Sequence, residues 1–177
     1  MGLVIDLVPN HMAISPENPW WWDVLTHGPS SRYAAYFDVD WDPPEARHSN
    51  AVLVPILGDH YGRALEAGEV QVRFENGAFT VHYYDNALPV DPASLGPILS
   101  AAAENPPDDQ LAFLAGAHDR LPDPGTVDRQ SAVRRYRDAE VLREMLARLG
   151  RADAANAHLA AALKLALAAL EDGAAGR

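Results

Sequence analysis

Residues 69–84 read Glu-Val-Gln-Val-Arg-Phe-Glu-Asn-Gly-Ala-Phe-Thr-Val-His-Tyr-Tyr, and this stretch predicts a β-hairpin. The dipeptide Asn76-Gly77 is typical of a two-residue type I′ turn, because both central residues of that turn need a positive φ. Counting outward from the turn gives three apolar cross-strand pairs: Phe74–Phe79, Val72–Val81 and Val70–Tyr83. Polar residues alternate with them, which indicates that one face of the hairpin is buried and the other solvated.

Upstream of the hairpin, residues 2–8 read Gly-Leu-Val-Ile-Asp-Leu-Val and are followed by Pro9. A short apolar run of this kind is typical of a strand buried on both faces of a parallel sheet. Such a strand requires neighbouring strands and covering helices, and nothing before residue 2 could supply them. We therefore expect the chain to be a piece of a larger α/β protein.

Downstream of Pro89 the composition shifts to alanine, leucine and arginine, which predicts a helical region. An earlier helix is expected to start at Asn18-Pro19, a capping residue followed by a proline at the first helical position, and to end at Gly28. The later helices are expected over residues 94–103, 109–118, 131–149 and 152–170. The apolar side of the third is expected to comprise Val141, Leu142, Met145, Leu146 and Leu149.

Charge and composition exclude several classes of partner. The chain has a net charge of -11 and no cysteine. An acidic protein repels phosphate backbones and anionic lipid surfaces, so we expect neither a nucleic acid nor a membrane as partner. The absence of cysteine excludes disulfides and thiolate chemistry, and the histidines show no ligand spacing, so we expect no metal and no other cofactor. We expect a cytoplasmic protein.

The first candidate site residues are Asp6, Asn10 and His11. Asp6 lies within the apolar strand, and the other two follow its end. In parallel α/β folds, ligands bind beyond the carboxyl ends of the strands, so a substrate would meet Asn10 and His11 there. The alternative is structural, with a buried aspartate fixing a turn and a histidine bonded to the backbone.

Three further candidates are Trp22, Asp59 and Tyr61. The consecutive tryptophans 20–22 cannot share one helix face, so at least one packs into the core while one or two could stack on a sugar ring. Asp59 and Tyr61 lie between Gly58 and Gly62, where they could either line a cleft or cap it.

The segment Asp6-Leu7-Val8-Pro9-Asn10-His11 resembles the first signature motif of the α-amylase superfamily. In that superfamily the motif lies on and after the third strand of a (β/α)₈ barrel. The resemblance implies that Asp6 is an organising residue and that His11 hydrogen-bonds the glucosyl unit at the cleavage subsite. Later segments resemble the maltooligosyl trehalose synthase branch: residues 18–25, 37–41, 57–62, 65–69 and 83–90.

The resemblance implies an α/β fold with a partial (β/α)₈ barrel. Residues 1–14 would form a barrel strand and its loop, residues 15–90 an inserted subdomain holding the hairpin 69–84, and residues 91–177 a helical region. The chain would be an internal fragment of an isomerase of trehalose biosynthesis. That enzyme converts the reducing-end α-1,4 linkage of a maltooligosaccharide to α,α-1,1 by intramolecular transglucosylation. Its partners would be the maltooligosaccharide and the rest of its own barrel.

Retaining chemistry at a glycosidic bond needs two carboxyl groups about 5 Å apart. The superfamily carries them after its fourth and fifth barrel strands, and no such motif occurs between Leu88 and Arg177. We therefore expect no catalytic residue in this chain, the nucleophile and acid/base lying beyond Arg177, and no synthase activity from the chain alone. Two alternatives stay open: a non-enzymatic carbohydrate-binding module, and a fragment of an α-glucan hydrolase of the same superfamily.

Overall fold

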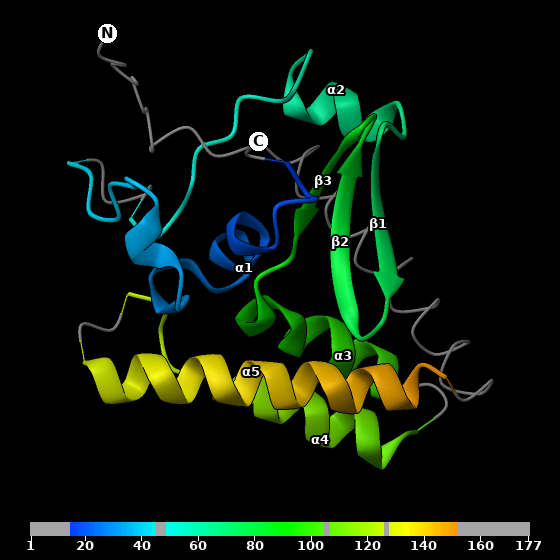
Figure 1. Ribbon diagram of the computed structural model, residues 1–177. Coiled ribbons are helices and arrows are strands. Elements are labelled where there is room, and N and C mark those ends of the chain that lie inside the picture. Colours follow the sequence, from blue (N-terminus) through cyan, green and yellow to red (C-terminus); the bar gives the residue numbers. More distant parts are fainter. Residues whose placement is uncertain (1–14, 45–48, 105–106, 126–127, 152–177) are drawn as a thin grey trace, which may run out of the picture.

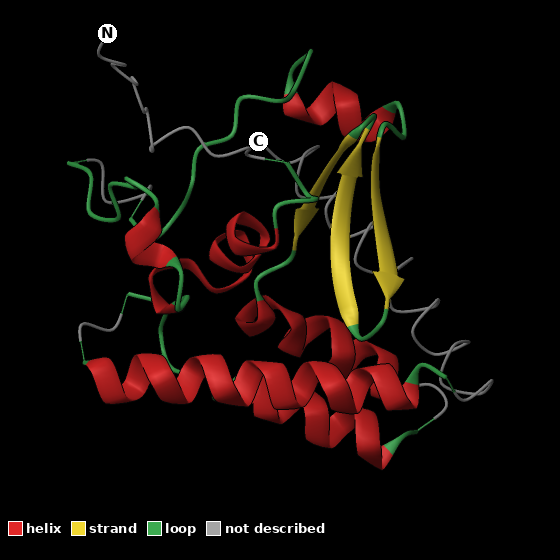
Figure 2. Ribbon diagram, viewed as in Figure 1, coloured by secondary structure: helices red, strands yellow, loops and turns green. Residues whose placement is uncertain are grey.

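The computed structural model describes residues 15–44, 49–104, 107–125 and 128–151, which combine helices with one antiparallel sheet (Figures 1 and 2). The elements run in the order α1 (Pro19–His27), η1 (Gly28–Ser30), η2 (Ala34–Tyr36), α2 (Tyr61–Glu66), β1 (Val70–Glu75), β2 (Ala78–Tyr83), β3 (Asn86–Pro89), η4 (Pro92–Ser94), α3 (Leu95–Glu104), α4 (Asp109–His118) and α5 (Arg129–Leu149), where η marks a 3₁₀ turn. The barrel strand expected in residues 1–14 and the helix expected over 152–170 lie outside the described residues. The partial barrel therefore stays a prediction.

The predicted hairpin is confirmed in type and register. β1 and β2 pair antiparallel, with Val70 opposite Tyr83, Val72 opposite Val81 and Phe74 opposite Phe79. Asn76 and Gly77 both have positive φ, 51° and 80°, as a type I′ turn requires. The turn chemistry and the alternation of apolar residues therefore specified the same pairing.

A third strand, β3, extends the hairpin and was not predicted. It pairs antiparallel with β2, with Leu88 opposite Val81 and Pro89 opposite Thr80, in the strand order β1-β2-β3. Proline has no backbone N–H to donate, so it is tolerated in a strand that has a neighbour on only one side. Its four residues give too short an alternation to be recognised in the sequence.

The helices begin and end where the capping residues indicate. The Asn18 side chain accepts hydrogen bonds from the N–H groups of Trp20 and Trp21, and Pro19 takes the first position of α1. Gly28 ends that helix with a φ of 57°. Asp108 and Asp128 cap α4 and α5 in the same way, with the carboxylate accepting two backbone N–H groups. Among the described residues, none of the helices has the length and apolar character to cross a bilayer.

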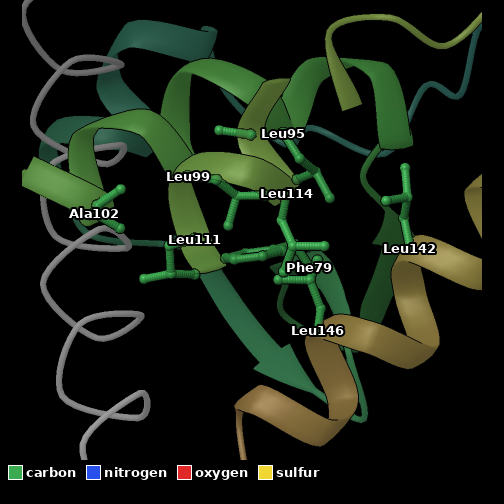
Figure 3. Close-up of a cluster of buried hydrophobic side chains, with 10 residues drawn as sticks. Phe79, Leu95, Leu99, Ala102, Leu111, Leu114, Leu142 and Leu146 are labelled. Carbon is green, nitrogen blue, oxygen red and sulfur yellow. The ribbon is translucent and has the colours of Figure 1, made fainter. Parts of the chain in front are cut away.

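The hydrophobic core lies between the hairpin and the three later helices (Figure 3). Phe79 of β2 is 2% exposed and meets leucines from all three helices. The buried members are Phe79, Leu95, Leu99, Ala102, Ala103, Leu111, Leu114, Ala115, Leu142 and Leu146. Because the core takes residues from both sides of Pro89, the hairpin and the helical region fold as neighbours in space.

The buried face of α5 differs from the one predicted. Leu142 and Leu146 are buried, but Val141 is 51% and Met145 37% exposed. Arg135, Ala139 and Ala147 complete the buried face instead. At Ala147 a small side chain is required, because the hairpin turn comes so close that a Cβ atom on Gly77 would lie 2.9 Å from the Ala147 Cβ.

Gly77 sets that close approach. A Cβ atom added to Gly77 would lie 2.0 Å from the carbonyl oxygen of Arg143 and 2.7 Å from the backbone nitrogen of Ala147. The tip of the hairpin therefore rests on the backbone of α5. Glycine meets two requirements at this position, a positive φ and the absence of a side chain.

Arg135 joins α5 to two segments that precede it. Its side chain is 1% exposed and donates to the Pro122 carbonyl oxygen and to Asp91 Oδ1, each at 2.5 Å. Asp91 also caps η4, where it accepts from the N–H of Ala93. A buried guanidinium is costly without partners, so these bonds hold α5, η4 and the linker before α5 in one arrangement.

Replacing Gly77 with alanine should destabilise the chain much more than replacing Gly68 with alanine. Both glycines have positive φ, but a Cβ on Gly68 meets nothing within 4 Å. Gly68→Ala should cost about 1–2 kcal/mol for the left-handed backbone, and Gly77→Ala about 1–3 kcal/mol more for the clash with α5. Urea denaturation of both variants measures the difference. Equal losses would show that the hairpin does not rest on α5.

Candidate functional site

A cavity of about 330 Å³ lies where α1, the hairpin turn, η4, α4 and α5 meet. Small-molecule pockets run from about 300 to 1,000 Å³, so this cavity suits a small ligand. It combines an indole ring, two histidines and several charged groups. The polar and aromatic lining residues are Trp22, Asp23, Thr26, His27, Glu75, Asn76, Phe79, His118, Glu140 and Arg143.

One wall carries the series His27, Glu140 and Arg143. His27 is 2% exposed, and its Nε2 lies 3.4 Å from Glu140 Oε1. Arg143 Nη2 donates to Glu140 Oε2 at 3.0 Å. The bonds from His27 and Arg143 lower the pKa of Glu140 to about 2 although partial burial opposes them, so this carboxylate is ionised at neutral pH.

The Arg143 side chain also reaches the hairpin. Its Nη1 donates to the carbonyl oxygen of Asn76 at 3.5 Å. The same helix that packs against Gly77 therefore also ties the turn to the wall of the cavity.

His118 lies on the other side of the cavity, at the end of α4. It is 1% exposed, and its Nδ1 lies 2.8 Å from the carbonyl oxygen of Pro92. Burial lowers the pKa of His118 below its usual value, against the weaker raising effect of that bond. The ring is therefore neutral at pH 7, with its hydrogen on Nδ1.

Each carboxylate oxygen of Asp23 accepts a hydrogen bond from a hydroxyl group. The Tyr136 hydroxyl donates to Asp23 Oδ2 at 2.7 Å, and the Ser31 hydroxyl donates to Oδ1. Burial and the bond to Asp23 raise the pKa of Tyr136 far above its usual value, so its hydroxyl stays protonated. The guanidinium carbon of Arg32 lies over the Tyr136 ring, 4.4 Å from its centroid.

The chemistry of these groups favours binding over catalysis. A general acid must hold a proton near neutral pH, and Glu140 does not. Asp23 accepts from two hydroxyl groups, which leaves it poorly placed to act as a nucleophile. No group of three or more histidine, aspartate and glutamate side chains suited to a metal ion occurs in the described part of the chain.

The sequence candidates do not form one cluster. Trp22 lines the cavity near the hairpin turn. Asp59 and Tyr61 lie at the other end of the hairpin, where the Tyr83 hydroxyl accepts the N–H of Gly58. Six residues of strand, about 20 Å by length, separate the two ends. Asp6, Asn10 and His11 lie outside the described residues, so their roles stay predictions.

Asp59 and Tyr61 are exposed and belong to the start of a helix. Tyr61 is 42% exposed and opens α2, a helix that was not predicted. Asp59 accepts from Arg63, one turn further on, at 3.4 Å. The cap of α2 is His60, whose side chain accepts from the N–H of Gly62. Neither Asp59 nor Tyr61 is among the residues that line the cavity, and their role at a cleft stays a prediction.

The three consecutive tryptophans take three different environments, as helical geometry requires. Trp21 is buried and packs on Phe37 with ring centroids 5.0 Å apart. Trp20 is 45% exposed and stacks on Tyr33 at 5.6 Å, with 14° between the planes. Trp22 is half-buried at the cavity.

No sequence pattern predicted a role for His27, His118, Glu140 or Arg143. The two histidines share only their position, since each is the last residue of its helix. Which helix ends meet depends on how the helices pack, and periodicity within one helix does not carry that information.

Replacing Glu140 with glutamine should give a loss of stability that depends on pH. The carboxyl has a pKa of about 2 in the fold against 4.5 ordinarily, so its ionised form stabilises the fold fully above that ordinary value. The stability gap between the two proteins should shrink as the pH falls below the ordinary value. Urea denaturation between about pH 7 and pH 3 measures this gap.

The matched control is Glu144→Gln on the same helix. Glu144 is 64% exposed and lies 4.0 Å from Arg148, so its loss should change stability little at any pH. A Glu140→Gln gap that stays constant across this pH range would contradict the assigned ion contacts.

Comparison with curated proteins finds two relatives, both from Mycobacterium tuberculosis, strain CDC 1551 / Oshkosh and strain ATCC 25618 / H37Rv. Each is named "Putative maltooligosyl trehalose synthase" and is 38% identical over 96 residues, which are 53% of this chain and 11% of the relative. The chain thus spans about a tenth of the length of these relatives. No family model and no solved structure matches it. Over about half its length the chain is similar to proteins named as maltooligosyl trehalose synthases, the branch that its motifs resemble.

Proposed function

We propose that this chain is part of a maltooligosyl trehalose synthase and contributes contacts to its maltooligosaccharide substrate. The observation that carries the proposal is the 38% identity over 96 residues to two proteins of that name. The motifs noted in residues 18–90 support the same assignment, since they follow one another in the order expected of that branch. The enzyme would act in the cytoplasm. A protein without cysteine forms no disulfides and so does not need an oxidising compartment.

The proposed reaction is an intramolecular transglucosylation that turns the reducing-end α-1,4 linkage into α,α-1,1. Such a reaction requires that the released glucose be held and that water be kept away from the intermediate. A segment that encloses the substrate would serve both needs. The close packing of the hairpin on α5 supports this role, because together they form a wall with a small cavity.

The catalytic carboxylates would come from residues that are not in this chain. Within the described cavity, Glu140 is held ionised and Asp23 is occupied by two hydroxyl donors, which supports a binding role. The barrel strand expected at residues 1–14, with Asp6, Asn10 and His11, would bring the segment to the active site.

The isolated chain should make no maltooligosyl trehalose from maltopentaose, because the nucleophile and the acid/base are absent. Chromatography of the reaction products measures this directly. Product formed by the purified chain, and lost on denaturation, would contradict the proposal that the chemistry lies elsewhere.

A chimera tests the family assignment itself. The 96 matched residues of the Mycobacterium tuberculosis relative are replaced by the corresponding residues of this chain. The chimera should form maltooligosyl trehalose from maltopentaose under the conditions in which the parent enzyme does. Replacing the same residues by a glycine-serine linker should abolish the activity. A folded but inactive chimera beside an active parent would refute the assignment.

A further inference from the structure

An apolar groove of about 600 Å³ lies between the start of α4 and the end of α5, two helices that pack side by side (Figure 1). Its lining residues are Asp109, Gln110, Phe113, Leu114, Met145, Arg148 and Leu149. Phe113 is 58% exposed and Met145 is 37% exposed. Two large apolar side chains at this groove therefore lack a full cover from the described part of the chain.

The apolar side of α5 is wider than the surface that its described neighbours cover. Leu142 and Leu146 are buried, whereas Val141 is 51% exposed. Val141 and Met145 are four residues apart, so they are neighbours on one face of the helix. An exposed apolar strip beside a groove is the kind of surface on which the apolar face of another helix packs.

The chain that follows α5 contains a sequence suited to this surface. Residues 152–170 lie outside the described residues, and the sequence predicts a helix there. Its leucine stripe, at helical spacing, comprises Leu159, Leu163, Leu167 and Leu170. The charged side chains of the segment at pH 7 are Asp153 and Lys164 alone. A helix with so little charge is expected to bury its leucines against a partner.

The end of α5 favours a chain that turns back along the same helix. α5 ends at Leu149, and the N–H of Arg151 bonds to the carbonyl oxygen of Arg148, three residues back, which closes a tight last turn. Gly150 and Arg151 are the two residues between α5 and the predicted helix. Helices joined by so short a loop pack as antiparallel neighbours.

The hairpin already occupies another side of α5 at this point. A Cβ atom added to Gly150 would lie 2.6 Å from Cε1 of Phe74. With about 100° of rotation per residue, Gly150 points roughly 140° away from Met145 around the helix. The side of α5 that carries the groove is therefore the open side for a returning chain.

We propose that residues 152–170 of this chain fold back along α5 as a helix and fill the groove between α4 and α5. Equal distances from the turn bring Ala155 close to Met145 and Leu159 close to Val141. The leucine stripe then covers the exposed apolar strip, and the alanines let the two helices approach closely. The inference rests on the exposed side chains and on the continuity of the chain, and it is independent of the proposed function.

Disulfide trapping tests this arrangement in the full chain, which has no cysteine of its own. Met145→Cys is combined in turn with Ala154→Cys, Ala155→Cys and Ala157→Cys. Mild oxidation should give an intramolecular disulfide in at least one pair, since the bond forms only where two Cα atoms come within about 7 Å. Glu144→Cys with the same partners is the matched control and should give none, because Glu144 is 64% exposed and faces a different side of α5.

NMR of the Met145 methyl group gives an independent readout without any cysteine. A soluble gadolinium chelate broadens the signals of methyl groups that it can approach. Leu159→Asp should release the segment and increase the broadening of the Met145 signal relative to the unsubstituted chain. Leu165→Asp is the matched control and should leave the broadening unchanged, because Leu165 lies on the other side of the predicted helix from the leucine stripe.

The outcomes are compared among variants with the circular dichroism of the unsubstituted chain. Disulfides between two chains instead of within one would make a second copy the occupant and overturn the inference. No disulfide in any Met145→Cys pair would place the segment elsewhere. Equal trapping by Met145→Cys and Glu144→Cys, or equal broadening in Leu159→Asp and Leu165→Asp, would show that the segment has no fixed position in the groove. Trapping through Met145→Cys alone, lost when Leu159→Asp is added, supports the inference.

Discussion

The contact between the hairpin turn and the backbone of α5 is the constraint on which the described structure depends. Gly77 combines a φ of 80° with a distance to α5 that leaves no room for a Cβ atom. The contact brings β2 over the helical region, so that Phe79 enters the core with Leu142 and Leu146 (Figure 3). The contact also determines which face of α5 is buried. Where the turn rests on the helix, alanine fits and a larger apolar residue does not.

The cavity follows from the same contact. The turn and α5 form one side of it, α1 brings Trp22 and His27, and the end of α4 brings His118. Arg135 fixes the position of η4 relative to α5 by bonding Asp91 and Pro122, and η4 carries the carbonyl oxygen that orients His118. In the described part of the chain, three buried side-chain atoms have no hydrogen-bond partner: His27 Nδ1, His118 Nε2 and Arg135 Nε.

Local sequence signals predicted most of the secondary structure but little of the candidate site. Asn76-Gly77 determined the hairpin and its register, and Asn18, Gly28 and Gly150 marked where helices begin or end, because each of these effects acts within a few residues. β3 and α2 were missed, since four and six residues give no usable periodicity. The outward position of Met145 and the meeting of His27 with Glu140 depend on tertiary packing, which no local pattern encodes.

A crystal structure of the full chain is the decisive measurement for the contact between the hairpin turn and α5. It should show Gly77 with positive φ, packed against the backbone of α5 at Arg143 and Ala147. A hairpin turned away from α5 would contradict this contact.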